Sequence, residues 1–375
     1  MRISLHTSGF RRYTGLRHGR MLVFAALVVV LGMFFAYVRL PSGWLIAGLI
    51  AAAAVAMASR RELNPPARAM ALAQGVIGLV AAEPLTRLKT TDLAHFAGCA
   101  AVSIGLTLVV SILLGLALHG VARQLDLPTA GLSLIAGGAS SIACMARELG
   151  ADQRYVALSQ YLRLTVVLIS MPFIVKGLGA TGSGAPTGMA QNAWSVPGLL
   201  AAALLIVVGS RLARLAHVPA PHLLGPLLLV AGAAVIAPSW VTLMNPPALV
   251  TGAAYVLVGW QAGGGFAVDT LRRFVRLVPV IAVFIALTIA SCFGIAAVVS
   301  EWTGVRMADA YLATTPGIYG VLAIADSVHA GPIVVTLQVL RYVTIVAAAG
   351  LIPKVLGLLH KCRVRDVQGL AGSAA

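Results

Sequence analysis

The stretches QYLR (160–163) and QVLR (338–341) each end in an arginine that directly precedes a long apolar run, LTVVLISMPFIV (164–175) and YVTIVAAAGLIP (342–353). A charged side chain inside a membrane span costs roughly 3 kcal/mol on insertion scales, so such a residue is seldom incidental. Two of them at matching places indicate a duplicated chain, with a site built on a pseudo-symmetry axis.

Composition places the chain among membrane proteins. Hydrophobic residues make up 59% of it and charged residues 10%, and the mean hydropathy is +0.95, whereas about 25% of a soluble domain is charged. Several apolar runs approach the ~20 residues that cross the hydrocarbon core as a helix. We therefore predict an all-α multi-pass membrane protein with the lipid bilayer as a partner. Basic residues beside spans account for the net charge of +16, so direct nucleic-acid binding does not follow from it.

Other motifs repeat in the same order. NPPA occurs at 64–67 and again at 245–248, and the segment entrances that begin at Pro41 and Pro219 also match. Together with the two QxLR stretches, the copies lie 181, 178 and 178 residues apart. Internal repeats of this kind define the domain organisation. The predicted units are a basic cytoplasmic tail (1–20), a first membrane repeat (21–178), a linker (179–193), a second membrane repeat (194–358) and a second cytoplasmic tail (359–375).

Each repeat contains six apolar segments, and the fifth of each is unusual. Segment 129–150 carries Gly-Gly, two serines and charges, and segment 309–331 carries Thr-Thr-Pro-Gly, an aspartate and a histidine. Non-helical backbone at membrane depth needs protein or water around it, so we expect each fifth segment to be broken or re-entrant. If it does not cross, most Lys and Arg residues lie on the cytoplasmic side, as the positive-inside rule requires. About five crossings per repeat, an odd number, then make the two repeats inverted, as in many secondary transporters.

The stretches GGASSIACMARELGAD (137–152) and QYLRL (160–164), with the paired entrances and NPPA, resemble the AbrB-duplication family of bacterial membrane proteins. The resemblance extends over nearly the whole chain. Members carry the labels AbrB family transcriptional regulator and putative ammonia monooxygenase, and their fold resembles that of cation–proton antiporters and anion transporters. The family's second copy usually has Thr-Pro-Gly-Gly with a glutamate shortly after it. Here residues 315–317 are Thr-Pro-Gly, but residues 318–321 are Ile-Tyr-Gly-Val, and the missing acid argues against a proton relay there.

The residues do not support the enzymatic label. Copper chemistry requires clustered imidazoles or thiolates. The eight histidines have no HxH or HxxxH spacing, and the four cysteines form no CxxC. We therefore expect no enzyme, no cofactor and no metal site. A regulator that binds DNA requires a soluble module, and no soluble stretch exceeds about twenty residues, so we expect any effect on gene expression to be indirect.

The candidate site lies on the helix faces that hold the two QxLR stretches. Each arginine follows its glutamine by three residues, which puts the pair on one face, and a guanidinium offers a planar fork of donors for carboxylate or phosphate. Half-helix N-termini within the fifth segments would add backbone donors. The candidates for substrate binding or gating are Arg163, Arg341, Gln160, Gln338, Glu148, Asp326, Ser140, Ser141, Thr315 and Gly317. We expect no catalytic residue.

A purely structural alternative stays open for both arginines. Arg163 would pair with Glu148, and Arg341 with Asp326, fifteen residues earlier in each copy. Each pair would join the fifth segment to the next helix. Asp326 has a second alternative role, as a coupling-ion or proton site.

The sequence is best interpreted as a transporter-like carrier of a small polar or anionic solute in the bacterial inner membrane, with both termini cytoplasmic. Gln74 and Gln261, which lie beside glycines in the third segments, would either line the solute path or serve helix packing. The alternative function is a membrane-embedded regulator that affects gene expression without transport or direct DNA binding. The identity of the solute and the existence of a homo-oligomer stay open.

Overall fold

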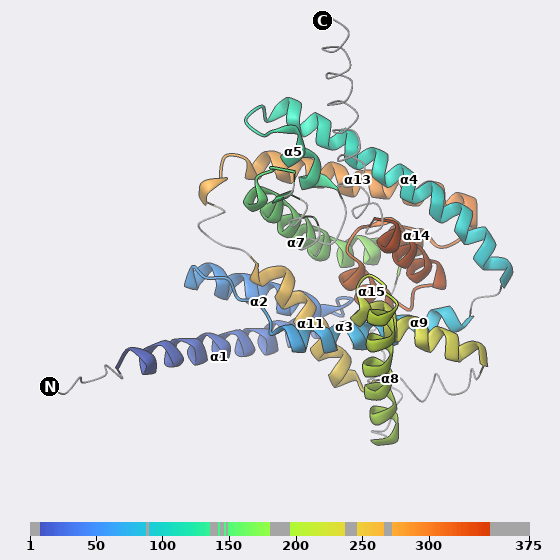
Figure 1. Cartoon of the computed structure of the whole chain (residues 1–375), viewed down its shortest axis with the longest axis horizontal. Coiled ribbons are helices and arrows are strands. Elements are labelled where there is room, and N and C mark those ends of the chain that lie inside the picture. The colour runs from blue at the N-terminus through green and yellow to red at the C-terminus, as the bar shows by residue number, and fades with distance from the viewer. Residues whose placement is uncertain are drawn as a thin grey trace, which may run out of the picture.

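The computed structural model describes residues 8–87, 90–135, 142, 146–147, 149–180, 196–236, 246–265 and 272–345. Within these ranges the chain is all-helical and has no strand (Figure 1). The first-repeat helices are α1 (Ser8–Tyr37), α2 (Gly43–Ser59), α3 (Ala67–Ala82), the 3-10 helix η1 (Glu83–Arg87), α4 (Thr90–Val121), α5 (Leu127–Leu134) and α7 (Gln153–Gly177). The second-repeat helices are α8 (Val196–Leu215), α9 (Pro221–Ile236), α11 (Ala248–Gly264), α13 (Val278–Thr303), α14 (Met307–Thr314), α15 (Ile318–Ser327) and the helix Pro332–Ile345. Helix α1 thus begins inside the stretch that we assigned to the N-terminal tail.

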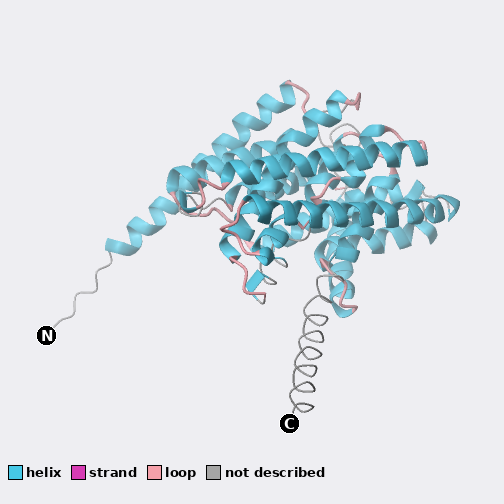
Figure 2. Ribbon diagram, turned by 90° about the horizontal axis from the view of Figure 1, so that it is seen from above, coloured by secondary structure: helices cyan, strands magenta, loops and turns pink. Residues whose placement is uncertain are grey.

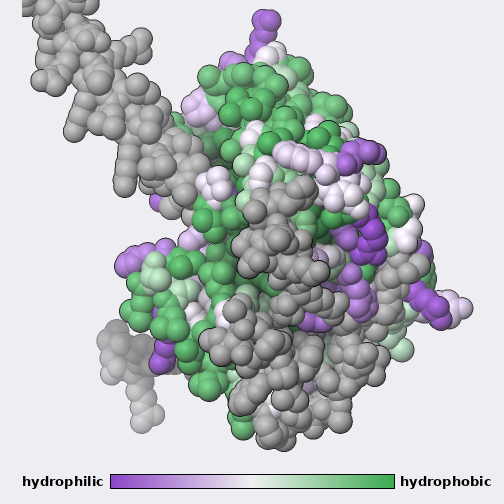
Figure 3. Space-filling view, turned by 90° about the vertical axis from the view of Figure 1, so that its right-hand side faces the viewer, coloured by the Kyte–Doolittle hydropathy of each residue, from purple (hydrophilic) through white to green (hydrophobic). Residues whose placement is uncertain are grey.

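Five of the described helices are long and apolar enough to cross a membrane. They are Gly19–Tyr37 of α1, Phe96–Val121 of α4, the whole of α7, Gly198–Leu215 of α8 and the whole of α13. In Figure 2 many helices run side by side, and in Figure 3 hydrophobic residues cover much of the visible surface that is described. The prediction of an all-helical fold compatible with a membrane is confirmed. The number of spans per repeat stays a prediction, because several other apolar helices are shorter.

The fifth segment of the second repeat is a broken helix, as predicted. Helix α14 ends at Thr314, Thr315 has extended backbone, and α15 begins at Ile318. Pro316 has no backbone N–H to continue the helix. Gly317 has φ 125°, a conformation that glycine adopts without the steric cost of a side chain. In the first repeat α5 ends at Leu134, and the stretch 136–141 lies outside the described residues.

The helix contacts between the two repeats occur in matched pairs. Second-segment helix α2 packs on third-segment helix α11, and in the reciprocal pair α9 packs on α3. The two fourth-segment helices, α4 and α13, pack on each other (Figure 1).

Two glycines at corresponding places make these contacts close. A Cβ atom on Gly259 would collide with the carbonyl oxygen of Leu45, and one on Gly78 would collide with that of Leu223. Each leucine lies in the first turn of a second-segment helix in the other repeat. Small residues allow two helix backbones to approach in this way. Both glycines therefore permit the close packing of α11 on α2 and of α3 on α9.

We predict that Gly259→Ala lowers the stability of the folded protein by about 1–3 kcal/mol, because the new methyl group overpacks the α2–α11 contact. The matched control is Gly294→Ala on α13, where nothing lies within 4 Å of the new Cβ. Its stability should stay within about 0.5 kcal/mol of wild type or rise, since alanine favours a helix. Thermal unfolding in detergent measures both, and equal melting temperatures for the two variants would contradict the close packing.

Candidate functional site

The second QxLR stretch closes the C-terminal end of half-helix α14. The guanidinium of Arg341 donates through Nη1 to the carbonyl oxygen of Thr314 (2.6 Å) and through Nη2 to that of Thr315 (2.7 Å). Nη2 also donates to Oε1 of Gln338 (2.5 Å). The amide nitrogen of Gln338 in turn donates to the carbonyl oxygens of Leu312 (2.6 Å) and Thr315 (2.9 Å). Arginine and glutamine therefore act as one donor group for the last carbonyls of the helix.

The first QxLR stretch makes the same arrangement with half-helix α5. Arg163 donates through Nη1 to the carbonyl oxygens of Leu134 (3.2 Å) and Ile135 (3.1 Å), and through Nη2 to Oε1 of Gln160 (2.6 Å). The amide nitrogen of Gln160 donates to the carbonyl oxygens of Leu132 (2.8 Å) and Ile135 (3.1 Å). The duplicated sequence thus produces a duplicated cap.

Helix geometry explains why these residues are needed. The last four carbonyls of a helix have no hydrogen-bond partner within it. Where the helix ends among apolar groups, water is not there to supply one. The C-terminal end also carries about −0.5 elementary charge, which a nearby cation stabilises. Arg163 and Arg341 are 6% and 5% exposed, so each cap is formed away from bulk solvent.

The proposed ion pair of Arg341 with Asp326 is wrong. Asp326 lies near the far end of α15, where its Oδ2 accepts a hydrogen bond from the hydroxyl of Tyr255 (2.5 Å). Arg341 lies near the other end of α15, at the break, and its guanidinium donates to backbone carbonyls. The corresponding first-repeat pair cannot be compared, because Glu148 lies outside the described residues.

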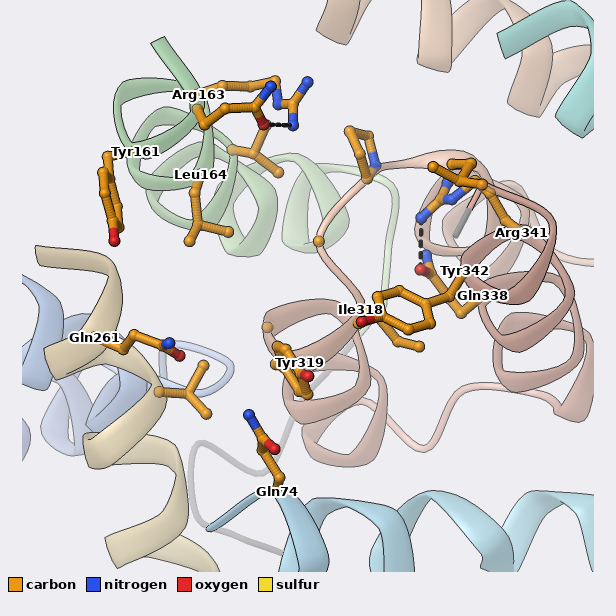
Figure 4. A pocket seen from close by; sticks show the side chains of 17 residues that line it. Gln74, Tyr161, Arg163, Leu164, Gln261, Ile318, Tyr319, Gln338, Arg341 and Tyr342 are labelled. Atoms are coloured by element: carbon orange, nitrogen blue, oxygen red, sulfur yellow. Dashed lines mark hydrogen bonds between the residues drawn. The ribbon is translucent and has the colours of Figure 1, made fainter. Parts of the chain in front are cut away.

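Both arginines also line one cavity of about 230 Å³. Its walls come from α3, α7, α11, the break before α15, the first turn of α15 and the helix Pro332–Ile345. Figure 4 shows the two arginines on one side of the cavity and the two glutamines of the third segments on the other. The lining residues with polar side chains are Gln74, Gln160, Tyr161, Arg163, Gln261, Tyr319, Gln338, Arg341 and Tyr342.

The cavity carries positive charge. The described residues that line it include two arginines and neither aspartate nor glutamate. The N-terminal turn of α15, with Gly317 and Ile318, opens onto the same space, and the first backbone N–H groups of a helix have no partner within it. Each arginine carries one positive charge, of which the helix end that it caps offsets about 0.5, and the N-terminus of α15 adds about +0.5. The local sum is then about +1.5 elementary charges. An anion is therefore the favoured occupant.

The predicted site residues fall into three groups. Arg163, Arg341, Gln160, Gln338 and Gly317 come together at the cavity. Thr315 is buried behind it: its hydroxyl donates to the Tyr311 carbonyl (2.6 Å), and its own carbonyl accepts from the cap. Asp326 lines a separate cavity. The predicted Ser140, Ser141 and Glu148 lie outside the described residues.

Three tyrosines in the cavity were not predicted. Tyr161 and Tyr342 follow Gln160 and Arg341 directly in the sequence. The spacing of three that pairs each glutamine with its arginine selects one helix face and does not include the adjacent residue. Tyr319 is in the stretch where the family's usual glycine and acid are absent, and it lies in the first turn of α15. The third-segment glutamines do line the cavity, in line with one of the two alternatives drawn from the sequence.

Comparison with known proteins gives a family match over most of the chain. The sequence model described as "Transition state regulatory protein AbrB" matches residues 4–123 and 44–357. The "Putative regulator AbrB" of Escherichia coli (strain K12) is 30% identical over 326 residues, covering 85% of this chain and 91% of the relative. The "Uncharacterized protein YhjN" of Bacillus subtilis (strain 168) is 26% identical over 388 aligned positions, covering 94% of this chain and 97% of the relative.

We predict that Arg341→Met lowers the free energy of unfolding by about 2–5 kcal/mol, because the buried carbonyls at the end of α14 lose their donors. Arg211→Ala is the matched control, since Arg211 is an exposed helical arginine on α8 and its loss should cost within about 0.5 kcal/mol. Thermal unfolding of both purified variants provides the measurement. If Arg341→Met melts together with the control, the cap does not stabilise the break.

Proposed function

The chain belongs to the AbrB family, and we propose that this member is an integral membrane carrier that moves a small anionic solute through the positive cavity between its repeats. The single observation that carries this proposal is a cavity that two buried arginines and a helix N-terminus line, with no acidic residue among its described lining residues. A volume of about 230 Å³ lies just below the ~300–1,000 Å³ of ordinary ligand pockets, so it favours a small solute.

The glutamines opposite the arginines give the cavity a second recognition element. Gln74 comes from α3 of the first repeat and Gln261 from α11 of the second. Among the described residues, neither side-chain amide makes a hydrogen bond with the protein, so both are available to a solute. An anion with a further hydrogen-bonding group fits such a cavity better than a simple inorganic ion does.

The arrangement of the helices supports the inverted-repeat part of the proposal. Contacts between the repeats come in reciprocal pairs, α2 with α11 and α9 with α3, as expected for two copies related by a two-fold axis. Broken helices that meet at a binding site between inverted repeats are typical of secondary transporters. We place the protein in the bacterial inner membrane with both termini cytoplasmic, and we propose no enzymatic activity.

The family description and the name of one relative favour a second candidate function. The family description reads "regulatory protein", and the E. coli relative is named a regulator. The alternative is therefore a membrane-embedded protein that affects gene expression without transport or direct DNA binding. Solute binding discriminates between the two functions.

Small organic anions should raise the melting temperature of the purified protein more than neutral amides or amines of the same size do. An anion at a hundred times its Kd would add about 2.7 kcal/mol of stability. Gln261→Leu, which removes a cavity amide, should weaken this response. Gln153→Leu, at the start of α7 and away from the cavity, should retain it.

Flux of the stabilising anion into proteoliposomes then tests transport. Stabilisation without flux would favour the regulator. Absence of stabilisation by any anion, with an unchanged cellular phenotype in the Gln261→Leu strain, would remove the carrier proposal.

Topology gives a separate prediction. A cysteine introduced at position 183, between the two repeats, should react in intact cells with a thiol reagent that cannot cross the membrane, because an odd number of crossings puts this linker outside. A cysteine introduced at position 61, after α2, should be protected. Protection at position 183 would contradict inversion.

A further inference from the structure

Exposed arginines gather where helices of the two repeats meet, away from the anion cavity. They come from the α4–α5 connection, the stretch before α7, the first turn of α7 and the segment that leads into α13. They are Arg123, Arg147, Arg154, Arg272, Arg273 and Arg276. We call this set the basic patch. None of its members lines the anion cavity.

One apolar cluster places the arginine-bearing helix ends beside one another. It contains Leu118 and Ala122 from the end of α4, Ala130 of α5, Tyr155 from the first turn of α7, and Leu277, which directly precedes α13. Helices α4 and α13 pack on each other, and this cluster joins the end of α4 to the start of α13 (Figure 1). The arginines beside these residues in the sequence therefore share one end of the helix bundle.

A ring contact joins the two repeats within the basic patch. The ring of Phe274 meets the ring of Tyr155 edge-on, with the centroids 5.2 Å apart. Arg154 directly precedes Tyr155, and Arg273 and Arg276 flank Phe274. This contact brings the arginines before α13 close to the arginine at the start of α7.

Two hydrogen bonds attach the remaining segments. Arg147 donates through Nη2 to Oε1 of Gln153, the first residue of α7 (3.2 Å). The backbone N–H of Asp152 donates to the hydroxyl oxygen of Thr129 on α5 (2.8 Å). The stretch before α7 is therefore held against α5, which follows Arg123 in the chain.

The basic patch has an excess of positive charge. In the segments that carry the arginines, the described acids are Asp126 and Asp152, and Asp152 accepts two backbone N–H groups at the start of α7. Glu148 and Asp269, which are close to these arginines in the sequence, lie outside the described residues. Even if all four acids are counted against the six arginines, two positive charges remain. The favoured partner of this surface is therefore an anion.

Exposed apolar side chains accompany the arginines. Val121 and Leu127, on either side of Arg123 in the sequence, are 67% and 48% exposed, and Val275, between Arg273 and Arg276, is 59% exposed. A soluble anion makes no favourable contact with such side chains. An anionic phospholipid, in contrast, presents acyl chains beside its phosphate, and basic sites at the ends of membrane helices bind headgroups of this kind.

We propose that the basic patch binds an anionic phospholipid of the surrounding bilayer. The guanidinium groups hold the phosphate, since their planar fork of donors matches its oxygens. The acyl chains lie along the exposed apolar side chains of α4 and α13, among them Leu113, Leu116 and Val283. Because the arginines come from both repeats, the bound lipid bridges the repeats. The site requires no solute and does not rest on the carrier function.

Native mass spectrometry of the full-length protein in detergent tests the site, because it resolves each bound lipid. The protein is titrated with dioleoyl phosphatidylglycerol or with the zwitterionic dioleoyl phosphatidylcholine. The wild type should bind phosphatidylglycerol at least tenfold more tightly. Each arginine near an anionic lipid contributes a factor of about five in affinity, so Arg273→Gln/Arg276→Gln should weaken the binding of phosphatidylglycerol about 30-fold. Its affinity for phosphatidylcholine should stay unchanged.

The matched control is Arg68→Gln/Arg211→Gln, which removes the same charge. Both arginines are exposed, on α3 and α8, and neither helix contributes to the apolar cluster beneath the basic patch. This variant should bind phosphatidylglycerol within about threefold of the wild type. All of the substituted side chains are exposed, so the melting temperatures of the two double variants without added lipid should match that of the wild type and exclude misfolding.

Three results would overturn the proposal. The first is equal affinity of the wild type for the two lipids, and the second is equal weakening in both double variants. The third is displacement of bound phosphatidylglycerol by millimolar inorganic phosphate, or by a short DNA duplex, at constant ionic strength, because the patch would then bind a soluble anion or a nucleic acid.

Discussion

The structure depends on how a helix can end among apolar groups. At the ends of α5 and α14 the last backbone carbonyls lie in buried or part-buried places, and each buried polar group left without a partner costs about 1–3 kcal/mol. The guanidinium and amide of each QxLR stretch supply the missing donors. Because the caps allow the fifth segments to stop partway, the chain can turn, start α15 and leave a polar cavity between the repeats. The two arginines, which in the sequence are isolated charges in apolar runs, therefore stabilise the helix ends at which the fifth segments break.

The sequence predicted the all-helical fold and singled out the two QxLR stretches as candidates for substrate binding or gating, but it did not predict that they cap helix ends. Spacing of three correctly placed each glutamine beside its arginine, and the two side chains do bond to each other. The alternative that paired Arg341 with Asp326 arose because an acidic side chain is visible in a sequence, whereas the backbone carbonyls that Arg341 contacts are not. The meeting of Gln74 with Gln261 depends on contacts between repeats, which local periodicity does not encode.

The caps also explain why a structural and a functional interpretation of the arginines need not compete. A guanidinium has five N–H donors. Arg341 donates hydrogen bonds to the two carbonyls at the end of α14, and the same residue also lines the cavity. The same charge then compensates a helix terminus and sets the sign of the cavity.

The reciprocal contacts of Gly78 with Leu223 and of Gly259 with Leu45 have a consequence for how the protein could be divided. Each repeat buries its closest backbone contacts in the other, so neither has a finished core of its own. A single repeat made alone would present bare glycine-lined helix faces to lipid and would gain most by pairing with a second copy. The two halves thus form one folding unit, and a break in the chain between them would be tolerated more readily than the loss of either half.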